Sequence, residues 1–137
     1  MPRKTDGNQI NNRMPLWTFA FPTGANVNHL YVRTRSGVYL SDAAQAWRDE
    51  AILRVRQSGQ TLPAGELVFG LWIYPPDGRR RDVDGLIKLT MDAVFAAFGD
   101  DDSRVACVSS MRMPRERPGK LTVRVWPLGE KEAIERD

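Results

Sequence analysis

The chain has little of what thiol and imidazole chemistry requires, and it has no long hydrophobic run. Its 137 residues contain one cysteine, Cys107, and one histidine, His29. A single cysteine excludes an internal disulfide, and together with one histidine it cannot form a zinc site. No apolar run approaches the roughly 20 residues that a membrane helix needs, and the first 15 residues hold no apolar signal segment. These absences predict a soluble, cytoplasmic protein with no membrane association.

The residues that are present suit one compact domain. Hydrophobic residues make up 42% of the chain, an ordinary share for a globular protein. Residues 1–14 are polar and without periodicity, which predicts a flexible N-terminal arm. Residues 129–137 form a charged C-terminal tail, and residues 15–128 are left as the folded domain.

Hydrophobic patterning and turn residues predict the order of elements. We expect strands over 16–21, 66–74, 104–113 and 120–126, a hairpin over 29–40, and helices over 43–57 and 85–98. The first helix follows the good N-cap residues Ser41 and Asp42. The apolar stripe of the second helix is expected to contain Ile87, Met91, Val94, Phe95 and Phe98. The strand over 66–74 is apolar on both faces, so it is predicted to be central and buried. The order predicts an α/β (α+β) fold, a single domain with a mixed β-sheet and two main helices.

Charge is unevenly distributed along the chain. The net charge is only +3, but Arg79, Arg80 and Arg81 are consecutive. A second basic cluster consists of Arg112, Arg115, Arg117 and Lys120, and aspartates stand at positions 82, 84 and 100–102. Clustered basic residues are the feature that nucleic-acid binding requires.

The aspartates beside the first basic cluster have the spacing of a metal site. In an extended segment, Asp82 and Asp84 would project to the same side. Magnesium prefers oxygen ligands and often uses one or two carboxylates together with substrate phosphate. Asp84, Lys88 and Asp92 are four residues apart, which places them on one helix face. Taken singly, each aspartate is more often a helix cap or part of a solvated face, but the adjacent arginines favour phosphate chemistry.

The segment RRRDVDGLIKLTMDAVFAAFGDDDSRV closely resembles the central motif of the RusA family of Holliday junction endonucleases. The family pattern has a basic run, Asp-x-Asp-Asn, a lysine four residues past the second aspartate, and an acidic pair ahead of a strand. Asp82, Asp84 and Lys88 fit it directly. Alignment to Val105 favours Asp102 as the third acid over Asp100 or Asp101. A weaker similarity covers the rest of residues 16–126, including PTGANVNHLYV with Asn28 and Tyr31.

Two departures accompany this resemblance. Gly85 stands where the family usually has asparagine, so any role of that amide is missing or moved. The interval between Asp84 and the acidic pair is one residue shorter than the common pattern.

The resemblance implies a homodimeric, Mg²⁺-dependent endonuclease, with Mn²⁺ as a possible substitute, that nicks four-way DNA junctions symmetrically. Asp82, Asp84 and Asp102 would bind the metal, and Lys88 would assist catalysis electrostatically. The proposed DNA contacts are Arg79, Arg80, Arg81, Asn28, Arg115, Arg117 and Lys120. Metal-activated water would attack the phosphodiester.

The predicted helix raises a question about the third acid. From Asp84 to Phe98 a continuous helix spans about 21 Å. The four residues from Gly99 to Asp102 can return at most about 13 Å. Either the chain folds back tightly, or a partner subunit supplies the third acid.

Two other functions compete with a junction endonuclease. One is a non-catalytic protein that binds branched or single-stranded DNA and uses its aspartates as helix caps. The other is a metal-dependent phosphodiesterase for a smaller substrate. The three aspartates with a well-placed lysine favour an enzyme, and the basic clusters favour DNA.

Overall fold

The computed structural model describes residues 15–22, 31–79 and 83–129. The elements in chain order are β1 (Leu16–Ala20), β2 (Tyr31–Thr34), β3 (Gly37–Leu40), α2 (Asp42–Gln57), β4 (Leu67–Tyr74), α3 (Val83–Phe98), the 3₁₀ turn η1 (Asp102–Arg104), β5 (Val105–Arg112) and β6 (Lys120–Pro127). This order confirms the predicted single α+β domain. The predicted arm 1–14, and the tail beyond residue 129, lie outside the described residues.

The main sheet has four strands in the order β1-β6-β4-β5. β4 pairs with β5 in parallel, whereas β6 runs antiparallel to both β1 and β4. The sheet is therefore mixed, as predicted. The connection from β4 to β5 passes through α3, as a parallel pair requires. The last residues of β4 and β5 consequently lie side by side at one end of the sheet, and their first residues lie side by side at the opposite end.

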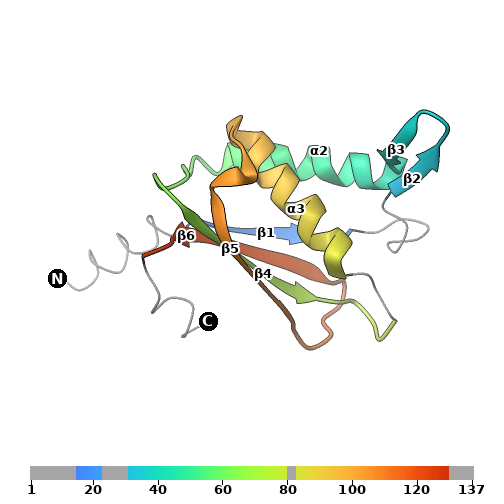
Figure 1. The fold of residues 1–137 in the computed structure, drawn as a ribbon. Helices are drawn as coiled ribbons and strands as arrows, with labels where there is room; N and C mark the ends of the chain where they lie inside the picture. Colours follow the sequence, from blue (N-terminus) through green and yellow to red (C-terminus); the bar gives the residue numbers. More distant parts are fainter. Residues whose placement is uncertain (1–14, 23–30, 80–82, 130–137) are drawn as a thin grey trace.

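Both helices lie on the same side of this sheet (Figure 1). The core lies between the two layers and is fully or almost fully buried. The strands contribute Trp17, Phe19, Leu67, Phe69, Leu71, Ile73, Leu121, Val123 and Val125 to it. Alternate residues of β6 are buried, while β4 is buried along most of its length because it lies between two strands.

Helix α2 begins where the N-cap signals predict. The Ser41 hydroxyl oxygen accepts a hydrogen bond from the backbone N–H of Ala44 at 3.2 Å. Gly59 follows the helix with φ 71°, a left-handed conformation that suits glycine at a helix end. α2 is tied to α3 by the ion pair between Arg48 Nε and Asp92 Oδ2, at 2.8 Å.

Helix α3 buries a wider face than the predicted stripe. Val94 and Phe95 are buried as expected, but Ile87, Met91 and Phe98 are only half-buried. The remaining buried positions are Leu86, Leu89, Thr90 and Ala93. The face is wider because α3 packs on the sheet and on α2 at once. Thr90 is tolerated there because its hydroxyl donates to the Leu86 carbonyl at 2.7 Å.

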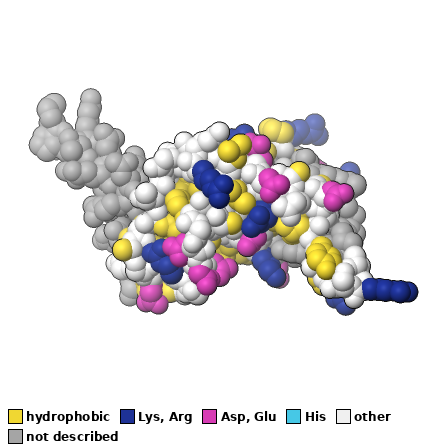
Figure 2. All heavy atoms as spheres, turned by 90° about the horizontal axis from the view of Figure 1, so that it is seen from above, with side chains coloured by type: hydrophobic (Ala, Val, Ile, Leu, Met, Phe, Trp, Pro, Cys, Tyr) yellow, Lys and Arg dark blue, Asp and Glu magenta, His cyan; other side chains and the backbone are white. Residues whose placement is uncertain are grey.

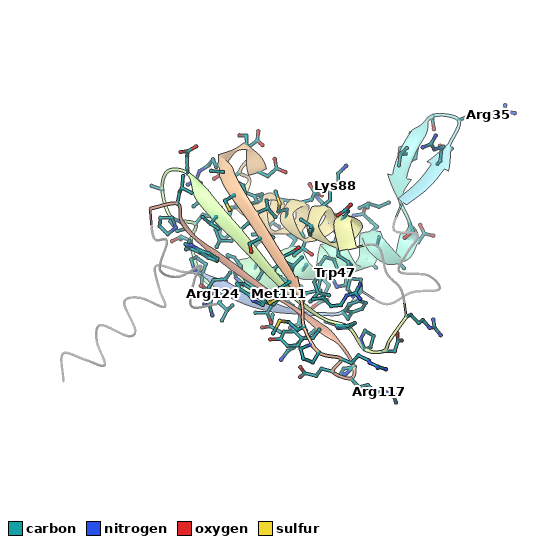
Figure 3. All side chains as sticks on the ribbon, turned by 60° about the horizontal axis from the view of Figure 1, so that its bottom comes forward. Arg35, Trp47, Lys88, Met111, Arg117 and Arg124 are labelled. Atoms are coloured by element: carbon teal, nitrogen blue, oxygen red, sulfur yellow. The ribbon has the colours of Figure 1, made fainter. Side chains whose placement is uncertain are left out.

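None of the described helices covers the other side of the sheet (Figure 3). Arg124 lies over the Trp72 ring, with the guanidinium carbon 5.7 Å from the ring centroid, and Lys120 Nζ lies 4.7 Å from the Tyr74 centroid. Cys107 is partly exposed, because β5 is an edge strand. Within the described ranges, no helix combines the length and hydrophobicity that crossing a bilayer requires.

Candidate active site and nucleic-acid interface

The first two turns of α3 carry two described residues of the predicted catalytic motif, Asp84 and Lys88. Asp84 and Lys88 are both exposed and lie one helical turn apart on the same face. Figure 3 shows the Lys88 side chain pointing outward from the helix. The third member of the stripe, Asp92, is instead paired with Arg48 of α2. The predicted stripe therefore divides into a candidate catalytic pair and a structural contact.

Several predicted site residues lie outside the described part of the chain. These are Asp82, Arg80, Arg81 and Asn28. Arg79 and Asp84 flank the first three of them in the sequence.

The acidic cluster after α3 lies at the end of the sheet where β4 and β5 begin. α3 is continuous over Val83–Phe98, and Asp102 begins the 3₁₀ turn that leads directly into β5. The start of β5 lies beside the start of β4, whereas α3 begins just after the end of β4. The structure thus does not form the tight return, and one chain does not bring Asp102 to Asp84. Among the described residues, no three histidine, cysteine or acidic side chains are close enough to hold a metal ion.

The three consecutive aspartates have different environments. The Asp100 carboxylate accepts the Asp101 N–H at 2.7 Å and pairs with Arg104 at 2.5 Å. The Asp101 hydrogen bond, followed by the contact with Arg104, holds the pKa of Asp100 below its usual value. Asp101 caps the 3₁₀ turn through the Ser103 N–H. The exposed Asp102 carboxylate has neither a hydrogen bond nor an ion pair within the described ranges.

Arg104 holds this turn in place. Its guanidinium donates to the Gly65 carbonyl and to the Pro63 carbonyl in the loop before β4, and it pairs with Asp100. The turn that carries Asp102 is therefore fixed against the body of the domain. A fixed position is what a ligand to a metal requires.

At the end of the sheet where β4 ends, three arginines line a cavity of about 330 Å³. The lining residues are Ile73, Pro75, Asp77, Gly78, Arg79, Leu86, Arg112, Met113 and Arg115. Arg79 and Arg115 are predicted DNA contacts. Arg112 belongs to the second basic cluster but was not among the predicted DNA contacts. A signal was available, because parallel pairing across a strand–helix–strand unit brings the end of β5 to the end of β4.

The other predicted contacts after β5 lie differently. Lys120 Nζ is 3.4 Å from Glu116 Oε1, in addition to its contact with Tyr74. Arg117 projects from the loop between β5 and β6, at the bottom of Figure 3. The structure therefore groups Arg115 with Arg112 and Arg79, and separates Lys120 and Arg117 from them.

The described basic side chains do not form one continuous patch on the helix-covered face. Figure 2 shows acidic and basic side chains interspersed there. The arginine-lined cavity is thus a local concentration of positive charge on a surface of mixed charge.

Comparison with known proteins shows to which class of protein the chain belongs. Residues 21–126 match the family model described as "Endodeoxyribonuclease RusA", so the class is that of the endodeoxyribonucleases. The match covers most of the chain, and the protein belongs to the RusA family.

Three similar proteins share one name. The chain is 27% identical over 121 residues to "Crossover junction endodeoxyribonuclease RusA" of Shigella sonnei (strain Ss046) and to that of Escherichia coli (strain K12). It is 28% identical over 121 residues to the protein of that name from Enterobacteria phage 82. Each alignment covers 85% of this chain and 98% of the relative.

Proposed function

We propose that the protein resolves Holliday (four-way) DNA junctions by paired, symmetric nicking that depends on Mg²⁺. The observation that carries the proposal is the exposed pair Asp84 and Lys88 on the first two turns of α3, the helix whose Leu86 lines the arginine-lined cavity. The names of the similar proteins support a junction as the substrate.

The donor set fits a divalent cation when two chains contribute to it. Asp84 and Asp102 offer carboxylate oxygens, which Mg²⁺ prefers, and both are exposed. Asp82 adds a third carboxylate two residues before Asp84. When bound, the cation supplies positive charge at the phosphate and lowers the pKa of a water molecule. Lys88 faces the negative charge that develops on the phosphate, and the arginines hold the backbone of the substrate.

A second copy of the chain supplies the missing acid through β5. This edge strand is eight residues long, and Val108 and Met111 are about half-exposed on it. A long exposed edge is a template for pairing with another strand. If two β5 strands pair antiparallel about a two-fold axis, the start of one lies beside the end of the other. Eight residues span about 26 Å. The pairing therefore places Asp102 of one copy near the end of the sheet where α3 of the other copy begins.

A cleavage assay tests the proposal. Purified protein is incubated with a labelled four-way junction, a linear duplex and a small phosphodiester, with and without Mg²⁺. We expect symmetric nicks on the junction only, which Asp82→Asn abolishes without loss of junction binding. Binding without metal-dependent cleavage would favour the non-catalytic DNA-binding protein, and cleavage of the small substrate alone would favour the phosphodiesterase.

A further inference from the structure

The arginine-lined cavity has the composition of an anion site. Arg79, Arg112 and Arg115 line it together with one acid, Asp77. The Asp77 carboxylate accepts the backbone N–H of Arg79 at 2.9 Å, so part of its hydrogen-bonding capacity is used within its own turn. The cavity is therefore lined by an excess of positive charge.

Arg112 and Arg115 have no acidic partner among the described residues. They come from the end of β5 and from the loop that follows it. Guanidinium groups present a planar fork of donors that matches two oxygens of a phosphate.

The loop that carries Arg115 is fixed to the end of β4. The Met113 N–H donates to the Ile73 carbonyl at 2.7 Å, and the Glu116 N–H donates to the Pro75 carbonyl at 2.9 Å. These two hydrogen bonds fix the loop to the end of β4, so the backbone position of Arg115 is fixed as well.

Gly78 leaves room for the Arg115 guanidinium. A Cβ atom at Gly78 would lie 3.1 Å from Arg115 Nη1 and 3.3 Å from its Cζ. A side chain at this position would require the guanidinium to shift by a few tenths of an ångström, so the glycine allows it to lie close to the turn over residues 77–79.

We propose that this cavity binds one backbone phosphate of the DNA, a neighbour of the phosphate that is cut, with Arg112 and Arg115 as the principal donors. The proposal rests on the proposed junction cleavage and names the contact that holds the strand. The apolar floor formed by Ile73, Leu86 and Met113 strengthens charge-assisted hydrogen bonds at the rim.

The chain limits which phosphate this is. Arg79 and Asp84 are five residues apart, at most about 17 Å in an extended chain. A DNA strand rises about 3.4 Å per nucleotide, so the bound phosphate lies within about five nucleotides of the cut.

The test combines neutral phosphates with protein variants. Single methylphosphonates replace each of the five phosphates on either side of the mapped cut, and junction binding is measured in EDTA, where no cleavage occurs. In the wild type, we expect one position to weaken binding about tenfold. Arg112→Gln should weaken binding of the unmodified junction by a similar factor and abolish the effect of that one methylphosphonate. The matched control is Arg56→Gln, which removes an exposed arginine of α2 that lines neither this cavity nor the one beside Arg117 and Lys120, and it should change neither.

Arg115→Gln provides a second variant. It removes the other principal donor at an exposed position, so we expect junction binding to weaken about as much as in Arg112→Gln while the thermal melting curve is retained. Wild-type affinity in Arg115→Gln would contradict its role as a donor to the phosphate.

The outcomes separate this proposal from the proposed function. If Arg112→Gln and every methylphosphonate act independently while the wild type still cuts junctions, the phosphate site is wrong and the junction nuclease stands. If the wild type neither binds nor cuts junctions, both fail.

Discussion

At the scale of single residues, three consecutive aspartates of identical chemistry perform different tasks. Asp100 pairs with Arg104, and Asp101 caps the 3₁₀ turn. Asp102 makes no such contact within the described ranges. The first two carboxylates build the turn, and we propose that the third binds the metal. Alignment to Val105 favoured the same residue.

Removing the charge of each aspartate should distinguish these tasks. We expect Asp102→Asn to lower junction cleavage by more than about a hundredfold, since even the outer partners of metal ligands matter by 10–100-fold. Asp101→Asn should retain cleavage, because asparagine is also a good cap. Single-turnover cleavage rates measure both, and equal losses in the two variants would contradict the assignment.

Another residue-scale prediction concerns Gly70 in the middle of β4. A Cβ atom there would lie 2.8 Å from Trp72 Cη2 and 3.0 Å from Trp126 Cη2. Trp126 is fully buried and cannot easily move. Gly70→Ala should therefore lower the free energy of unfolding by about 1–3 kcal/mol, the usual cost of overpacking.

Urea unfolding measures this change. The matched control is Ser109→Ala, because Ser109 is the register partner of Gly70 on exposed β5. An unchanged midpoint in Gly70→Ala would show that the tryptophans yield without cost.

At the scale of elements, patterning predicted the strands and helices but not how they pair. β5 and β6 follow one another along the chain, yet β4 lies between them. The continuous apolar run of β4 did predict a central position. The parallel pairing of β4 with β5 depends on how α3 crosses the sheet, which is a tertiary property. The wide buried face of α3 was missed for a related reason, because it needs both the sheet and α2.

The exposed edge of β5 gives a prediction at this scale. Lysine on an edge strand opposes pairing with another strand, so Val108→Lys should convert a dimer into a folded monomer that no longer cuts junctions. Leu53→Lys is the control, because Leu53 is exposed to a similar degree, 49% against 45%, but lies on α2. Sedimentation velocity measures the mass, and a dimer retained in Val108→Lys would exclude pairing through β5.

At the scale of the whole molecule, the sequence predicted the motif but left the position of the third acid open. The spacing of Asp84 and Lys88 places them one helical turn apart, and the structure confirms this. The position of Asp102 depends on whether α3 stays continuous and on the register of β5, and local spacing determines neither. The continuous helix favours a site completed by a second chain.

Mixing two inactive variants tests this shared site most directly. Asp82→Asn and Asp102→Asn subunits are combined, and nicking of a labelled four-way junction is measured with Mg²⁺. If the acids act across the dimer, each mixed dimer contains one intact site, and we predict single nicks well above the level of either homodimer. If the acids act within one chain, every site carries a defect. Activity no higher than that of the two homodimers would then contradict the account.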